Sequence, residues 1–187
     1  GEGSIERAYL ERTCGDMTLR AGRQVVHWGH GLKFNPTDPF PELFLVDPWF
    51  ERDGTDGLRV DAAMGEDGGL TAAWATAGSY GERRTAVRWY RSGGVDRALV
   101  WVHDHAFGRD RFGVDVKGDL TVGWWFEGVR AQSGLGDYDE WVAGIDYTFD
   151  VREGLWIAVE RYYEGSGAAS TGAYDWYGLT LGTRLTP

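Results

Sequence analysis

Four histidines are the residues whose type and spacing most directly suggest metal chemistry in this chain. They form two pairs, His27 with His30 and His103 with His105. Imidazole nitrogens bind transition metals, so each pair could supply two ligands. The pairs belong to strand-like segments that are far apart in the sequence, and each intervening strand adds about 4.8 Å to their separation. We therefore expect polar loop residues here, and neither a metal nor another cofactor.

Three carboxylates, on Glu127, Asp146 and Glu160, resemble the paired groups of a general acid and base. They are interleaved with Arg and Lys, however, and this arrangement favours solvated ion pairs across a wall of strands. Nucleophilic catalysis has no better support, because no serine lies in a Gly-x-Ser-x-Gly motif. The residues that could do chemistry indicate a protein that is not an enzyme.

The composition excludes further classes of protein. The 187 residues carry 19 basic and 29 acidic side chains, and the net charge of −10 argues against a nucleic-acid partner. A single cysteine, Cys14, cannot form an internal disulfide. The sequence has neither the apolar run that a transmembrane helix needs nor the pattern of a signal peptide at its start. We expect that a signal peptide has been removed or that the chain begins inside a longer protein.

The clearest structural pattern lies at residues 112–126, which read FGVDVKGDLTVGWWF. Apolar residues alternate with polar or small residues on both sides of Gly118 and Asp119. A period of two around such a pair is a strong signal of a β-hairpin. The sequence therefore predicts a hairpin whose turn lies at residues 118–119 and whose Asp115 and Lys117 share one face.

The same alternation recurs along the chain and predicts eleven strands and no helix. The predicted strands span residues 5–12, 17–28, 58–64, 70–77, 85–92, 95–104, 112–117, 120–126, 141–149, 155–163 and 174–185. The connections alternate in length, so short turns fall at one end of the sheet and long loops at the other. Outer-membrane barrels show this asymmetry. We expect residues 1–187 to form one antiparallel up-and-down transmembrane β-barrel, or part of a longer one, with about 11–12 visible strands.

Polar residues gather on one face of the predicted strands. Eleven strands enclose more space than side chains fill, which favours a wet, polar lumen. Aromatic residues near the long-loop ends suggest an interfacial girdle, formed by Trp28, Phe112, Trp125, Phe126, Trp141, Tyr162, Tyr163, Trp176 and Tyr177. The predicted lumen-facing or solute-binding residues are Arg20, Gln24, Arg59, Asp61, Arg88, Asp115, Lys117, Glu127, Asp146, Glu160 and Arg184.

The connection at residues 29–57 is the predicted functional element outside the wall. A loop of this length without its own secondary structure is usually functional or disordered, and its aromatic residues argue against disorder. One hypothesis is that it packs into the lumen and narrows it, with Asp38, Asp47, Glu51 and Asp53 setting a charge preference. An outer cap without a gating role fits the pattern equally well.

Two groups of short segments resemble bacterial outer-membrane porin-like β-barrel proteins. They are GRQ at 22–24 with WG at 28–29 and NPTD at 35–38, and GIDYTF at 144–149 with GL at 154–155 and ERYY at 160–163. The resemblance implies a location in the Gram-negative outer membrane, with outer-membrane lipid as a partner. It also implies passive or selective passage of small polar solutes, and it is compatible with a homo-oligomer.

Two alternatives remain open at this point. The apolar and polar faces would be reversed in a soluble, ligand-binding β-barrel, which keeps its apolar side chains inside. A structural or assembly barrel in the outer membrane would show the same strand pattern without transport. Detergent dependence separates the first alternative from a channel, and conductance in planar bilayers separates the second.

Overall fold

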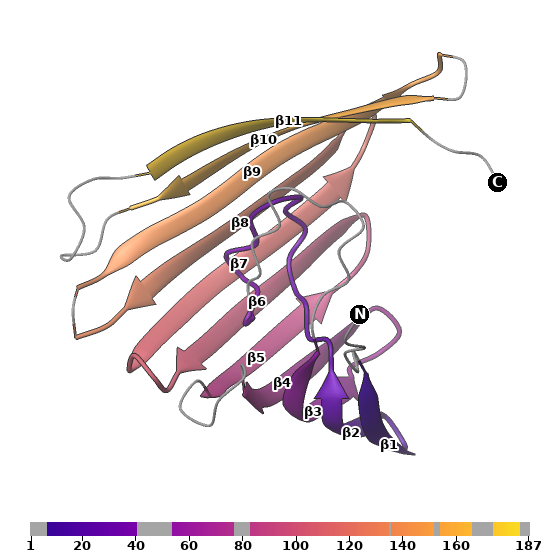
Figure 1. Ribbon diagram of the computed structural model, residues 1–187. Helices are drawn as coiled ribbons and strands as arrows, with labels where there is room; N and C mark the ends of the chain where they lie inside the picture. Colours follow the sequence, from indigo (N-terminus) through magenta and orange to yellow (C-terminus); the bar gives the residue numbers. More distant parts are fainter. Residues whose placement is uncertain are drawn as a thin grey trace, which may run out of the picture.

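The chain folds into one antiparallel sheet of eleven strands in sequence order (Figure 1). The computed structural model describes residues 7–40, 54–76, 83–134, 136–151, 154–165 and 174–183, and this part of the chain contains no helix, hence none that could cross a membrane. The strands are β1 (Ala8–Cys14), β2 (Met17–Gln24), β3 (Thr55–Ala63), β4 (Gly68–Thr76), β5 (Arg83–Arg91), β6 (Val95–Asp104), β7 (Arg109–Asp119), β8 (Gly123–Gln132), β9 (Tyr138–Phe149), β10 (Leu155–Glu164) and β11 (Tyr174–Thr183).

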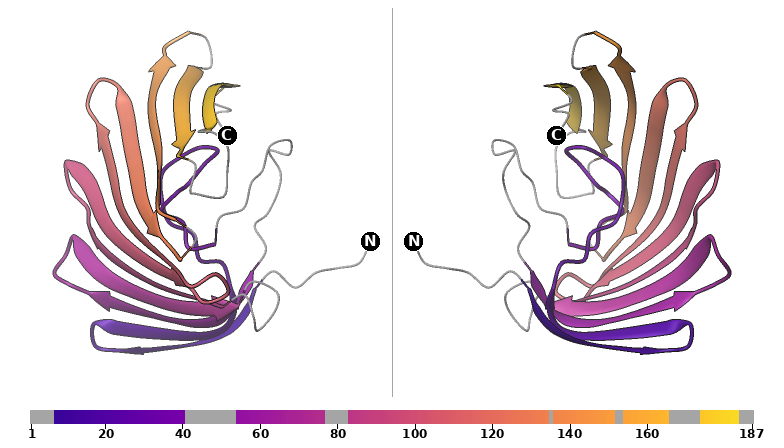
Figure 2. Two further views of the ribbon diagram at one scale, coloured as in Figure 1. Left: turned by 90° about the vertical axis from the view of Figure 1, so that its left-hand side faces the viewer. Right: turned by 90° about the vertical axis from the view of Figure 1, so that its right-hand side faces the viewer.

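The sheet is strongly curved, with a convex outer face and a concave inner face (Figure 2). Each strand pairs with its neighbours in sequence, and β1 and β11 are the two ends of the order. The prediction of an antiparallel up-and-down sheet is confirmed. Closure into a barrel is not, because the described residues of β1 and β11 form no ladder with each other.

The outer face carries a continuous band of apolar side chains. Cross-strand partners on this face are themselves apolar, as in Leu58 with Trp74, Leu99 with Val114, and Val159 with Leu179. Except for β5, each strand exposes at least one large apolar side chain among its described residues. A period of two thus sends one set of side chains outward along the whole sheet.

The predicted hairpin exists, but its turn is displaced. Strand β7 continues through Gly118 and Asp119, and the turn lies at residues 120–122. Gly118 lacks the positive φ that a two-residue hairpin turn needs. It lies opposite Trp124, whose indole ring occupies the space that a Cβ on Gly118 would fill. The glycine therefore makes room for a side chain within the ladder.

The predicted alternation of short and long connections is also wrong at two places. Strands β6 and β7 are joined by residues 105–108, and β8 and β9 by residues 133–137, so both connections are as short as the turns at the opposite end. Polar pairs extend these strands beyond their apolar parts. His103 Nδ1 lies 3.0 Å from Asp110 Oδ1, and Arg130 Nη1 lies 2.9 Å from Asp139 Oδ2. Such ends lack the apolar alternation on which the prediction depended.

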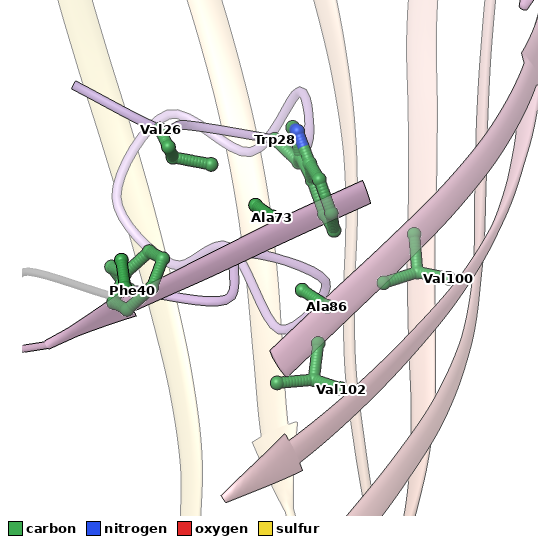
Figure 3. Close-up of a cluster of buried hydrophobic side chains, with 8 residues drawn as sticks. Val26, Trp28, Phe40, Ala73, Ala86, Val100 and Val102 are labelled. Carbon is green, nitrogen blue, oxygen red and sulfur yellow. The ribbon is translucent and has the colours of Figure 1, made fainter. Parts of the chain in front are cut away.

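A segment of residues 25–40, here called the inner segment, leaves the sheet after β2 and lies on the concave face (Figure 2). The strand predicted to reach residue 28 therefore ends at Gln24, and the connection to β3 covers residues 25–54. Its apolar side chains Val26, Trp28 and Phe40 pack on small residues of the wall (Figure 3). The wall residues in this cluster are Ala73, Ala75, Ala86, Val100 and Val102 of β4, β5 and β6.

This cluster is the main apolar core that the described residues contain. Large side chains on the wall would prevent the inner segment from approaching, so alanine at these inner positions is what the packing requires. Trp28 and Phe40 are nearly fully buried, and each such burial contributes about 1.5–3 kcal/mol. The inner segment and the wall therefore share one apolar core.

Candidate functional site

The inner segment changes direction at residues whose backbone is suited to turns. Gly29 has a φ of 94°, and a Cβ there would lie 2.6 Å from both carboxylate oxygens of Glu127. A tight turn follows, in which the amide of Asp38 donates to the carbonyl of Asn35 at 3.0 Å. Asp38 Oδ1 then accepts from the amide of Phe40 at 3.0 Å. These local bonds fix the path of the backbone across the concave face.

Glu127 on β8 is the main anchor of the inner segment. Its Oε1 accepts from the backbone amides of His30 at 2.6 Å and Gly31 at 2.7 Å. Its Oε2 accepts from the hydroxyl of Thr37 at 2.7 Å and from the Thr37 amide at 3.3 Å. The side chain is completely buried. A carboxylate removed from water is stable only when its lone pairs are occupied, and here four donors occupy them.

Glu160 on β10 binds the next two amides of the inner segment in the same way. Its Oε2 accepts from the amide of Leu32 at 2.7 Å, and its Oε1 accepts from the amide of Lys33 at 3.2 Å. Trp125 Nε1 donates to Oε2 at 3.1 Å. Phe34 then stacks on Tyr162 of β10, with ring centroids 4.0 Å apart. The second carboxylate therefore holds the part of the segment that faces β9 and β10.

Two arginines bind the carbonyl groups of the same segment. Arg111 on β7 donates to the carbonyls of Pro36 at 3.4 Å and Asp38 at 3.2 Å. Arg84 on β5 donates to the carbonyl of Pro39 at 3.1 Å and pairs with Asp104 at 2.9 Å. The carboxylates of the wall thus accept hydrogen bonds from amides of the segment, and the arginines of the wall donate hydrogen bonds to its carbonyls. Except for the Thr37 hydroxyl, the groups of the segment that Glu127, Glu160, Arg84 and Arg111 bind are backbone amides and carbonyls.

Histidines of the inner segment complete the network. His30 Nδ1 lies 2.7 Å from Asp115 Oδ1, and Arg88 Nη2 lies 3.5 Å from Asp115 Oδ2. His27 Nδ1 pairs with the buried carboxylate of Asp38. Each of these two buried carboxylates therefore has a polar partner on the inner segment.

The register places the predicted lumen residues of the described strands on one face. Among them, Gln24, Asp115, Glu127 and Glu160 are buried, three of these by the inner segment. The remaining ones also lie on the concave face: Arg20, Arg59, Asp61, Arg88 and Asp146 are partly exposed, and Lys117 is exposed. Arg184 lies outside the described residues.

The less buried charges form short local networks. Arg20 pairs with Glu11 on the neighbouring strand. Arg59 Nη2 donates to Asp61 Oδ1 at 2.8 Å, and the Thr71 hydroxyl donates to the same oxygen at 2.7 Å. Asp146 accepts from Trp156 Nε1 at 2.8 Å. This surface therefore presents both guanidinium and carboxylate groups.

The residues predicted to form a constriction have different positions. Asp38 is fully buried, and its carboxylate contacts His27 and the Phe40 amide. Asp47, Glu51 and Asp53 lie outside the described residues. Within the described chain, the atoms that the inner segment presents to open space include the side chain of Leu32, which is 46% exposed.

Sequence reasoning missed His30, Thr37, Arg84 and Arg111 as members of this site. A signal for the inner segment was present in the alanines of β4 and β5. Ala73, Ala75 and Ala86 occupy inner positions where a wet lumen would carry polar side chains. Small apolar residues on both faces indicate that something covers the inner face.

The aromatic girdle predicted from the sequence divides between the two faces. Trp28, Trp125 and Tyr162 are buried on the inner side, which makes their assignment to a girdle wrong. Phe112, Phe126 and Tyr177 are exposed. Trp141 and Tyr163 stack on each other, with ring centroids 5.7 Å apart.

The histidine pairs do not converge on a common point. His103 contacts Asp110, and His105 Nε2 lies 2.9 Å from the Thr85 hydroxyl. The described residues include no group of three or more His, Cys, Asp or Glu side chains placed to hold a metal ion. The geometry around the inner segment is that of an anchored backbone.

Comparisons with known proteins return no matching family model and no matching curated protein.

Proposed function

We propose that this chain forms the wall of a porin-like channel in the outer membrane of a Gram-negative cell, through which small polar solutes pass. The observation that carries the proposal is the apolar outer face. Leu10, Leu99 and Leu179, on β1, β6 and β11, are 81%, 55% and 66% exposed. Soluble monomers rarely expose apolar patches beyond a few hundred Å². A band that follows the sheet from one end to the other is suited to lipid.

The inner face supports the same proposal. Its charges lie on the concave side, where a membrane barrel carries its water-filled lumen. A soluble ligand-binding barrel has the opposite arrangement, with apolar side chains inside and charges outside. Ion pairs such as Arg59 with Asp61 in partly exposed positions are stable in contact with water. The two faces together favour lipid outside and water inside.

The inner segment is the proposed constriction of the lumen. It is anchored across the concave face from β5 to β10 and therefore reduces the space open to a solute. The two anchoring carboxylates are already occupied by amides. The charged groups available to a passing solute are then those that stay partly or fully exposed near the turn end, including Arg20, Arg59 and Lys117.

Reconstitution of the purified protein tests the proposal. We expect it to need detergent or lipid to stay monodisperse and to produce discrete conductance steps in a planar bilayer. A protein that remains monodisperse in plain buffer contradicts the membrane location and supports a soluble barrel instead.

One observation favours a second candidate, a structural outer-membrane barrel without transport. The inner segment is packed so closely that Thr37 and Asp38 are nearly inaccessible. If the complete lumen were filled in the same way, solutes could not pass. Stable insertion into bilayers without any conductance would favour this candidate over a channel.

A further inference from the structure

A shallow groove of about 560 Å³ interrupts the outer face between β6 and β9. We call it the outer groove, and its apolar lining is formed by Leu99, Phe112, Val114, Phe126, Gly128 and Trp141. Gly128, which has no side chain, lies in the lining of the groove. The register places Gly128 directly between Val114 and Trp141, and a Cβ on Gly128 would lie 3.1 Å from the ring of Phe126.

One end of the outer groove is polar and contains charges of both signs. Arg130, at the rim, pairs with Asp139 at 2.9 Å and with Asp137 at 3.2 Å. The guanidinium of Arg161 lies 5.2 Å from the centre of the Trp141 ring, which forms one wall of the groove. This polar rim therefore holds two guanidinium groups and two carboxylates, while the rest of the groove is apolar.

Aromatic residues beside the polar rim indicate at which level of a bilayer the rim would lie. Trp141 stacks on Tyr163, and Arg161 also lies over the ring of Tyr177, 5.1 Å from its centre. Tyrosine and tryptophan favour the boundary between hydrocarbon and headgroups. The rim therefore lies at headgroup level if the outer face meets lipid, and the apolar part extends toward the hydrocarbon.

We propose that the outer groove binds one acyl chain of a zwitterionic phospholipid, whose headgroup lies on the polar rim. Phosphate is a natural partner of a guanidinium group, and a primary ammonium is a natural partner of a carboxylate. The carboxylates of Asp137 and Asp139 would repel a headgroup that carries only negative charge. The balanced charges of the rim favour a headgroup that carries both signs. This inference rests on the proposed membrane location.

Retained lipid, counted by native mass spectrometry, tests the proposal. The probes are phosphatidylethanolamine and phosphatidylglycerol with identical chains, added to detergent micelles. Gly128→Leu fills the groove and is expected to lower retained phosphatidylethanolamine by at least about tenfold, since each methylene excluded from the groove weakens binding. Ala72→Leu adds the same side chain to the outer face of β4, outside the groove, and is expected to retain lipid like the unmodified protein.

A charge change at the rim tests the headgroup. The unmodified protein is expected to retain phosphatidylethanolamine in preference to phosphatidylglycerol. Asp137→Asn combined with Asp139→Asn leaves only the arginines, and we expect the preference to reverse. If Gly128→Leu does not fold, Val114→Trp fills the groove from the opposite strand.

Insertion into liposomes, measured on the same preparation, separates the two proposals. A protein that inserts but retains equal lipid with and without Gly128→Leu overturns the groove inference alone. Equal retention of both lipids overturns the assignment of the headgroup. A protein that stays out of liposomes overturns the proposed function, and the lipid site with it.

Discussion

Glu127 illustrates how a single side chain can determine the path of a whole loop. Its four donors come from three residues of the inner segment that are one to seven positions apart. Hydrogen bonds to a charged acceptor contribute about 1.5–3 kcal/mol each when both partners are buried. Without the inner segment, this carboxylate would lie on the wall with its lone pairs open to water.

Replacing Glu127 with Gln is expected to loosen the inner segment. The amide nitrogen of Gln cannot accept the bonds that one carboxylate oxygen accepts, so at least one donor is left unpaired in a buried site. We expect the His30 and Gly31 amides to exchange hydrogen at least about tenfold faster, which corresponds to about 1.4 kcal/mol. Hydrogen-exchange mass spectrometry measures this rate, and Glu11→Gln on the exposed β1 serves as the control. Unchanged exchange would contradict the role of Glu127 as an anchor.

A methyl group at residue 29 provides an independent test of the same contact. In Gly29→Ala the new Cβ would meet the Glu127 carboxylate, and the residue would have to keep a positive φ. We expect the inner segment to become more accessible to protease, because its docked conformation is strained by about 1 kcal/mol or more. Gly93→Ala is the matched control, since Gly93 has open space around it. Equal cleavage of the two variants would show that position 29 tolerates a side chain.

Residue identity predicted which face of the wall a side chain occupies, but not its partner. Alternation with a period of two correctly grouped Asp115, Glu127 and Glu160. It could not reveal that residues 30–37 cover them, mostly through backbone amides, because nearly every residue has such an amide and the sequence does not show which ones are used. The partners depend on a contact between positions about 100 residues apart, and no local pattern encodes such a contact.

At the scale of elements, the wall and the inner segment are complementary. Strands β4, β5 and β6 present small side chains where the apolar part of the segment packs, and β7, β8 and β10 present charges where its backbone turns. Strand boundaries were harder to predict than strand faces. Polar pairs such as His103 with Asp110 continue a ladder without apolar alternation.

If the chain forms the proposed channel, deleting residues 36–50 is expected to raise its single-channel conductance. The deletion removes Thr37 and Asp38 from the concave face, so less of the lumen is obstructed. A control that replaces residues 105–108, an exposed connection at the same end, with Gly and Ser is expected to leave conductance unchanged. If the deletion conducts like the unmodified channel, the inner segment is not the constriction.

At the scale of the whole molecule, a charge placed on the outer face tests the proposed contact with lipid. Leu58→Arg, on β3, is expected to lower the free energy of unfolding in liposomes by about 2–4 kcal/mol if residue 58 lies near the bilayer midplane. The same change on a surface in contact with water would be nearly neutral, since Leu58 is 49% exposed. Urea titration followed by tryptophan fluorescence measures the difference, with Leu120→Arg in the β7–β8 turn as the control. Equal stability of both variants would contradict contact with lipid.

The direction of the strands restricts how the sheet can close. In an antiparallel meander all odd-numbered strands run the same way, so β1 and β11 are parallel to each other. An all-antiparallel barrel therefore requires an odd number of additional strands between them. This accounts for the even total that such barrels have.

Disulfide formation tests whether β1 and β11 are neighbours. In a Cys14→Ser background, the pair Leu10→Cys and Leu179→Cys is expected not to cross-link, because at least one further strand would place them about 10 Å apart. Val159→Cys with Leu179→Cys, which are direct partners on β10 and β11, is the positive control. Cross-linking of the first pair to the same extent would mean that β1 and β11 close the barrel directly in parallel.

The way the inner segment is held has a consequence for how this protein can change over time. Glu127, Glu160, Arg84 and Arg111 contact the segment almost entirely through its amides and carbonyls, which every residue except proline supplies in full. Side chains such as that of Leu32, which point into open space, can therefore be exchanged without loosening the anchor. The wall therefore holds the backbone in one place while the exposed side chains can vary, so mutation or design could change the surface of the concave face one residue at a time.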